Sequence, residues 1–101
     1  MKILAIGAHP DDIEIFMYGI LSIYKKRGEE LSLLVATDGS KGGENTKKNL
    51  IETRRKETVL GLEKIGIPTL LNLPDGSLGN NIEHKKKIES QINKFSPDLI
   101  I

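Results

Sequence analysis

Mainly apolar runs alternate with longer amphipathic segments along this chain. Short continuous apolar runs are typical of strands buried in a parallel sheet. Four such runs predict strands, at residues 2–7, 31–36, 69–73 and 97–101. Between them, apolar residues recur every three or four positions, which is the period of a helix with one buried face. Three helices are therefore expected, at residues 12–27, 50–65 and 82–95.

The first predicted helix follows an acidic pair. Asp11 or Asp12 can begin this helix, because acidic groups are favourable at the positive end of a helix, and Gly28 can end it. The apolar positions form one predicted face, which comprises Ile13, Phe16, Met17, Ile20, Leu21 and Tyr24. We therefore expect one continuous helix that packs by this face.

Alternation of strands and helices indicates an α/β fold with right-handed crossovers. We expect a Rossmann-like three-layer αβα arrangement, with a mostly parallel sheet in the order 3-2-1-4, as a single domain over residues 1–101. This order places the carboxyl end of the first strand at the topological switch point, where ligands bind. A polar, glycine-bearing loop is expected over residues 37–49. The fourth strand would form an edge that a complete domain normally covers, so we expect an N-terminal portion, truncated at strand 4.

The composition excludes several classes of function. The 101 residues carry a net charge of +1, 38% apolar and 29% charged residues, and no tryptophan or cysteine. A nearly neutral chain with few aromatic residues gives no reason to expect a nucleic-acid partner. Thiolate metal sites and disulfides are excluded. No apolar stretch approaches the length of a membrane span or a signal peptide core, so a cytoplasmic location is expected.

The segment Gly7-Ala8-His9-Pro10-Asp11-Asp12 directly follows the first predicted strand. His9 and Asp12 are close enough in sequence to converge on a divalent metal, and Asp11 could then accept a proton from the attacking water. Glu14 could orient one of the metal-binding side chains through a hydrogen bond without binding the metal itself, or it could be solvated. The residues alone leave a second interpretation open, in which the aspartates cap a helix and the histidine is structural. His84, the only other histidine, is expected to be solvated.

The residues from Ala8 to Glu14, together with Gly19, resemble the N-terminal signature of the LmbE-like/PIG-L zinc N-deacetylases, with the bacillithiol-type N-acetylglucosaminyl deacetylases as the nearest group. Members of this family remove acetyl groups from N-acetylglucosaminyl compounds and from diacetylchitobiose. The resemblance covers essentially the whole chain and implies metal-assisted hydrolysis of an amide on a small amino-sugar substrate. It implies that His9 and Asp12 bind Zn²⁺, with another divalent metal as an alternative, and that Asp11 is the catalytic base.

The same resemblance implies that part of the apparatus lies outside this chain. In the family, a third zinc ligand and an oxyanion-stabilising group are histidines on a loop after the fourth strand, and the chain ends before that loop. We therefore expect the chain to bind zinc weakly and to turn over little substrate. Two positions also depart from the family: Tyr18 replaces a glycine, and Ser40 stands where many relatives carry glutamate.

Three further positions resemble parts of the family's substrate site. The resemblance implies that Asp38 lies in a loop that borders the substrate and that Arg54, in an arginine-x-x-glutamate pattern with Glu57, meets the sugar. It also makes Asp75 a candidate acceptor for sugar hydroxyls. Simpler interpretations stay open. Arg54 and Glu57 could form an exposed helical pair, and Asp75-Gly76 could be only a turn.

The sequence was also compared with the patterns of other functions. A dinucleotide site needs a Gly-x-Gly-x-x-Gly turn, whereas Asp11 and Asp12 would repel a pyrophosphate there. The segment 39–43 lacks the spacing of a P-loop. The better alternative is a non-catalytic interaction module, or an inactive deacetylase remnant. In that case the open edge at residues 99–101 could pair with a second copy to form a homo-oligomer.

Overall fold

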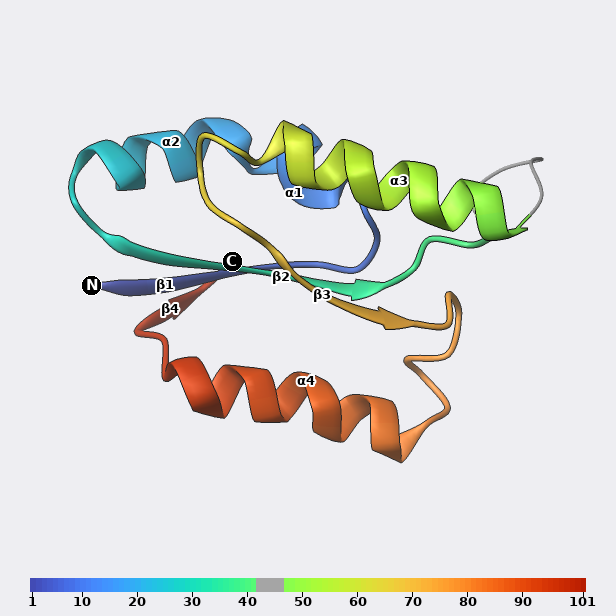
Figure 1. Ribbon diagram of the computed structural model, residues 1–101. Helices are drawn as coiled ribbons and strands as arrows, with labels where there is room; N and C mark the ends of the chain where they lie inside the picture. The colour runs from blue at the N-terminus through green and yellow to red at the C-terminus, as the bar shows by residue number, and fades with distance from the viewer. Residues whose placement is uncertain (42–46) are drawn as a thin grey trace.

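The computed structural model describes residues 1–41 and 47–101 and forms a three-layer α/β fold (Figure 1). The strands form one parallel sheet in the order β3-β2-β1-β4, which confirms the predicted fold class and strand order. The elements are β1 (Lys2–Gly7), α1 (Asp12–Phe16), α2 (Tyr18–Lys26), β2 (Glu30–Thr37), α3 (Lys47–Gly61), β3 (Thr69–Leu73), α4 (Ile82–Phe95) and β4 (Leu99–Ile100).

Helices α1, α2 and α3 cover one face of the sheet, and α4 lies against the other (Figure 1). β1 and β2 are paired from Lys2↔Glu30 to Gly7↔Val35, so these two parallel strands end at the same edge. β3 pairs with β2 up to Thr37↔Leu73, and its end therefore lies at that edge as well. This register brings the loops after three different strands together. The predicted site residues lie in or directly after these loops, except Arg54, which is in α3.

The main core lies between the sheet and the α1–α3 layer. Its buried members come from both layers: Ala5, Ile13, Leu21, Leu33, Val35, Leu62 and Ile65. Three consecutive residues of β1 and five of β2 are buried. Burial on both faces of the sheet explains why these strands are continuous apolar runs in the sequence.

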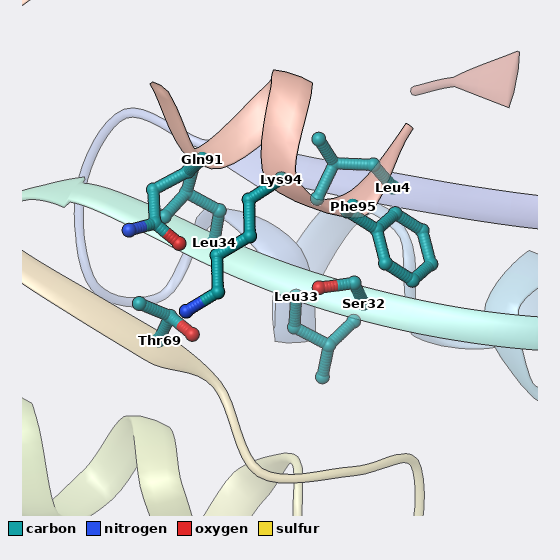
Figure 2. Close-up of a pocket in the computed structure, with 8 residues that line it drawn as sticks. All are labelled: Leu4, Ser32, Leu33, Leu34, Thr69, Gln91, Lys94 and Phe95. Carbon is teal, nitrogen blue, oxygen red and sulfur yellow. The ribbon is translucent and has the colours of Figure 1, made fainter. Parts of the chain in front are cut away.

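The opposite face of the sheet is less tightly packed. A cavity of about 250 Å³ lies between α4 and the sheet, with Leu4, Leu34 and Phe95 in its lining (Figure 2). No α4 residue is fully buried. The cavity lining contains the charged group of Lys94 but no carboxylate and no histidine. The predicted chemistry therefore does not reside there.

The first predicted helix is interrupted, contrary to expectation. Met17, with φ −120° and ψ −8°, separates α1 from α2. Ile13 and Leu21 are fully buried, whereas Phe16 is 78% exposed and Ile20 is also exposed. The single apolar face predicted for this segment is wrong at these two positions.

The second predicted helix also differs at its ends. It was expected over residues 50–65, whereas α3 spans Lys47–Gly61. Leu62 and Ile65 instead belong to the turn that follows, where they remain buried in the core. Of the loop expected over residues 37–49, the start belongs to β2, the end to α3, and residues 42–46 lie outside the described residues. Within the described part of the chain, we find no helix both long and apolar enough to span a membrane.

Candidate active site

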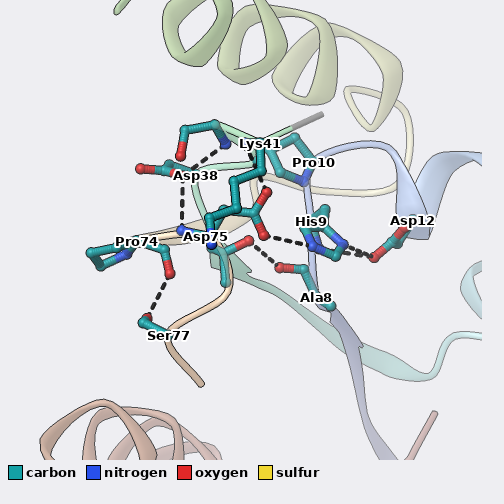
Figure 3. Close-up of polar contacts among 12 residues, drawn as sticks. Ala8, His9, Pro10, Asp12, Asp38, Lys41, Pro74, Asp75 and Ser77 are labelled. Atoms are coloured by element: carbon teal, nitrogen blue, oxygen red, sulfur yellow. Dashed lines mark hydrogen bonds and ion pairs between the residues drawn. The ribbon is translucent and has the colours of Figure 1, made fainter. Parts of the chain in front are cut away.

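Backbone and side-chain hydrogen bonds join the ends of β1, β2 and β3. The N–H and the hydroxyl of Thr37 both donate to the carbonyl oxygen of Ala8, at 2.9 and 2.7 Å. The N–H of Asp38 donates to the carbonyl oxygen of Leu73 at 2.9 Å. These bonds fix the starts of three loops relative to one another, and the loops carry the polar side chains shown in Figure 3.

His9 lies between two carboxylates. Its Nε2 is 2.9 Å from Oδ1 of Asp75, and its Nδ1 is 3.5 Å from Oδ2 of Asp12 (Figure 3). The backbone N–H of His9 also donates to Oδ2 of Asp12 at 2.8 Å, which holds the Asp12 side chain beside the ring. The side chains of His9 and Asp12 are partly exposed, at 43% and 31%, so a ligand can approach them.

The spacing of His9 and Asp12 is compatible with a shared metal ion. Two atoms that bind one ion tetrahedrally, each at about 2.1 Å, lie about 3.4 Å apart. The separation of His9 Nδ1 and Asp12 Oδ2 is 3.5 Å. Within residues 1–41 and 47–101, however, no group of three or more histidine, aspartate or glutamate side chains is arranged to hold a metal. The described residues therefore fit two positions of a metal site.

Asp11 adopts a backbone conformation that is rare for a residue with a side chain. Its φ is 100° and its ψ is −32°, at the residue that precedes α1. This conformation directs the Asp11 carboxylate to Arg54, whose Nη2 donates to Asp11 Oδ2 at 2.8 Å. Residues outside the usual φ/ψ regions cost about 1–3 kcal/mol and cluster at functional sites. The strain at Asp11 is consistent with a positioned carboxylate.

Arg54 connects the loops after β1 and β2. In addition to Asp11, it donates to the carbonyl oxygen of Pro10 at 2.9 Å and to that of Gly39 at 2.7 Å. Its side chain is only 16% exposed. The alternative that Arg54 and Glu57 form an exposed helical pair is therefore wrong, because the guanidinium pairs with Asp11 across the fold.

Asp75 is the most buried carboxylate of the site, with a side chain 9% exposed. Oδ1 faces His9 and Oδ2 accepts a hydrogen bond from the N–H of Lys41 at 3.0 Å. Burial by itself would raise the pKa of Asp75. The Lys41 N–H, the charge and hydrogen bond of the His9 ring, and the Lys41 charge together outweigh burial, so the pKa of the Asp75 carboxyl lies below its usual value.

Asp38 holds two loops in place. Its Oδ1 accepts hydrogen bonds from the N–H of Ser40 at 2.9 Å and from the N–H of Asp75 at 3.2 Å. The position of Asp75 is thus fixed both through its own backbone and through its carboxylate. The predicted contact of Asp38 with substrate stays a prediction.

An open hollow of about 390 Å³ lies at the center of this arrangement. Its lining residues are His9, Asp12, Lys41, Arg54 and Asp75. Asp11 and Asp38 are not among them, and they contact the lining through Arg54 and Asp75 respectively. All five lining residues have polar or charged side chains, and they carry both signs of charge, which suits a small hydroxylated ligand.

Comparison with known proteins identifies the family. Residues 4–101 match the family described as GlcNAc-PI de-N-acetylase (PIG-L). The chain belongs to the PIG-L family. Over 108 aligned residues it is 31% identical to the diacetylchitobiose deacetylase of Thermococcus kodakarensis, with 99% of this chain and 39% of that protein covered.

Solved structures agree with this assignment. The N,N'-diacetylchitobiose deacetylase from Pyrococcus horikoshii, solved with an inhibitor, superposes with a TM-score of 0.86 at 30% identity, over 98% of this chain and 39% of that one. The 4-carboxy-2-hydroxymuconate hydratase GalB from Pseudomonas putida has a TM-score of 0.85 at 17% identity, over 98% and 45% of the two chains, and it shows the fold alone. This chain thus spans less than half the length of these relatives.

Lys41 was not predicted from the sequence as a residue of this hollow. Its backbone N–H binds Asp75, and its side chain lines the hollow. It lies three residues after Asp38, so its position in the predicted substrate loop was the available signal. Tyr18, the departure from the family's glycine pair, is partly buried and packs against the hydrophobic core. A Cβ on the adjacent Gly19 would meet no atom within 4 Å, so close packing does not require a glycine there.

Two other expectations need correction. His84 is not simply solvated, since it is half-buried and its Nδ1 lies 2.8 Å from the hydroxyl of Ser77. Glu14 packs against α3, where its side chain lies 3.5–3.6 Å from the position that a Cβ on Gly61 would take. Its Oε1 is buried and, among the described residues, has no hydrogen-bond partner. Glu14 therefore does not orient His9 or Asp12.

Proposed function

We propose that this protein takes part in metal-dependent removal of an acetyl group from an N-acetylglucosamine-type substrate, with Zn²⁺ as the metal. The observation that carries the proposal is the 3.5 Å separation of His9 Nδ1 and Asp12 Oδ2, with the Asp11 carboxylate in the same loop. Family membership and the diacetylchitobiose deacetylase relatives support the class of reaction and of substrate. Because the chain covers 39% of those relatives, the activity of the whole protein is itself part of the proposal.

His9 and Asp12 would hold the metal ion. When bound, the ion would supply Lewis-acid activation of water and of the acetyl carbonyl. Asp11 would accept the proton of the attacking water, as a general base must. Arg54 holds the Asp11 carboxylate at 2.8 Å, and this contact keeps the carboxylate in one orientation.

The substrate would lie in the hollow beside His9 and Asp12. Arg54 uses three N–H groups on Asp11, Pro10 and Gly39 and has five in total, so two remain for sugar hydroxyls or for the acetyl oxygen. Asp75 has further lone pairs that could accept from a hydroxyl group. Contacts of Arg54 and Asp75 with the sugar are thus proposed because both residues line the hollow. A contact of Asp38, which does not line the hollow, is proposed only on its position beside Asp75.

Weak metal binding is expected, because the described residues provide two metal ligands and a catalytic zinc site usually has three. The proposal is tested by calorimetric titration of the wild type with zinc at pH 7.5. His9→Ala and Asp12→Ala should each abolish measurable binding. His84→Ala is the matched control, since it removes the other histidine of the chain and should leave binding unchanged.

Acetate release from N,N'-diacetylchitobiose then tests the reaction. Slow, zinc-dependent release that Asp11→Asn abolishes would support the proposed base. Unchanged zinc affinity in either His9→Ala or Asp12→Ala would remove that residue from the ligand set. A protein that binds no zinc, releases no acetate and sediments as a dimer would favour the interaction module.

A further inference from the structure

We propose that Asp75 is a positioning residue for His9, which it holds so that Nδ1, and not Nε2, is presented to the metal ion beside Asp12. This inference rests on the proposed metal-dependent function and assigns the nitrogen atom that binds. It gives Asp75 a role different from the expected contact with sugar hydroxyls. The supporting observations are the burial of Asp75, its fixed position, and the opposite directions in which the two ring nitrogens of His9 face.

Asp75 is built to stay in one place. Its side chain is 9% exposed, and each of its carboxylate oxygens has a partner, His9 Nε2 at 2.9 Å and the Lys41 N–H at 3.0 Å. Its backbone N–H is bound by Asp38, and the turn that follows is closed by a hydrogen bond from the Ser77 N–H to the Pro74 carbonyl at 3.1 Å. These hydrogen bonds fix the orientation in which the Asp75 carboxylate meets His9.

The chemistry of the imidazole ring then determines which nitrogen is free. A carboxylate can only accept a hydrogen bond, and a neutral imidazole has one N–H. When the ring is neutral, as it must be to bind a metal, the contact of 2.9 Å places the hydrogen on Nε2 and leaves the lone pair on Nδ1. Nδ1 faces Asp12, whose Oδ2 lies at the 3.5 Å spacing that one tetrahedral ion requires (Figure 3).

Such an arrangement is physically favourable for a metal ligand. A hydrogen bond from the second ring nitrogen to a carboxylate fixes the tautomer and the ring orientation and makes the ligand more basic. Loss of such a partner typically lowers metal affinity by about 10- to 100-fold. Because Asp75 lies 66 residues from His9 in the sequence, the contact also makes the metal ligand depend on the loop after β3.

The test compares Asp75→Ala and the conservative Asp75→Asn with the wild type in zinc titrations. Asp75→Ala should weaken zinc binding by about 10- to 100-fold, and Asp75→Asn should weaken it less, because the amide oxygen can still accept from Nε2. Glu89→Gln, on the exposed surface of α4, removes the same charge elsewhere and should leave zinc affinity unchanged. Amide NMR spectra of each variant establish that it is folded.

Nitrogen NMR of histidine-labelled protein gives a readout that a merely structural role would not change. Zinc should shift the Nδ1 resonance of His9 in the wild type, and in the metal-free protein the hydrogen should reside on Nε2. A zinc-induced shift on Nε2, or equal zinc affinity of Asp75→Ala and the wild type, would overturn the inference about Asp75. The proposed function would still stand in that case, provided that zinc binding depends on His9. A wild type that binds no zinc would overturn both.

Discussion

Replacement of Gly39 by alanine places a methyl group where the guanidinium of Arg54 now lies. An ideal Cβ at this position would be 2.6 Å from Nη1 and 2.9 Å from Cζ of Arg54, and 3.0 Å from Cδ of Pro10. Gly39 also has a φ of +68°, which side chains disfavour. Gly28, with a φ of +82° and no atom within 4 Å of such a Cβ, is a matched control that carries the backbone cost without the clash.

The expected cost has two parts. The left-handed conformation costs about 1–2 kcal/mol for a residue with a Cβ, and both glycine variants should lose this amount. At Gly39 the methyl group must also displace Arg54, the end of a flexible side chain, from its three hydrogen bonds at 2.7–2.9 Å. Charged hydrogen bonds contribute about 1.5–3 kcal/mol each when buried. Because the Asp11 side chain is 35% exposed and solvent screens its charge, we assign about 2 kcal/mol to the three hydrogen bonds of Arg54 together.

Urea denaturation of four variants separates the two parts. Gly39→Ala should lower the free energy of unfolding by about 2 kcal/mol more than Gly28→Ala does. In an Arg54→Ala background the cost of Gly39→Ala should fall toward that of Gly28→Ala, because there is no guanidinium left to displace and only the contact with Pro10 Cδ at 3.0 Å remains. If the effects of Gly39→Ala and Arg54→Ala simply add, the methyl group does not act through Arg54 and this reasoning is refuted.

The remaining predictions concern stability. Thr58→Val should raise the free energy of unfolding by about 1 kcal/mol, because the Thr58 hydroxyl is buried with no partner among the described residues. Thr37→Val should lower it by about 1 kcal/mol, because it removes the hydrogen bond to Ala8. Melting temperatures of the two variants that shift in the same direction would contradict this. Asp11→Gly should be more stable than Asp11→Asn by about 1 kcal/mol, since glycine tolerates a φ of 100°, and equal denaturation midpoints would show that Asp11 is not strained. Asp75 has a lowered pKa, so it stabilises the fold above about pH 3.9, and this contribution is lost as the pH falls through its folded-state pKa. The stability of Asp75→Asn should therefore depend less on pH in this range. Identical acid unfolding curves for the variant and the wild type would contradict this prediction.

The parts of the fold that could be predicted depend on local patterns. β1 and β2 are continuous apolar runs because they are buried on both faces, and the alternation with helices was sufficient for the sheet order. The break at Met17 was missed, because methionine is a good helix former and an isolated glycine such as Gly19, two residues later, is tolerated inside a helix. The end of α3 at Gly61 was missed because the apolar pattern continues through Leu62 and Ile65, which are buried in a turn.

The site was predictable in its location and only partly in its contacts. Residues at the carboxyl ends of parallel strands meet at one edge, and this brought His9, Asp38 and Asp75 together as expected. The pairing of Arg54 with Asp11 joins residues 43 positions apart, and no periodic pattern in the sequence encodes such a contact. It is determined by the direction of α3 and by the unusual backbone of Asp11, and both emerge only in the folded chain.

The polar contacts divide the site into two halves with separate supports. Asp75 holds His9 on the side of the proposed metal ion, and Arg54 holds Asp11 on the side of the proposed base. Within residues 1–41 and 47–101, no hydrogen bond joins Asp75 to Arg54, although the four-residue segment 9–12 links the halves covalently. Residues without shared partners usually act additively. Loss of Arg54 should therefore slow proton transfer and leave zinc affinity nearly intact, whereas loss of Asp75 should weaken zinc binding first.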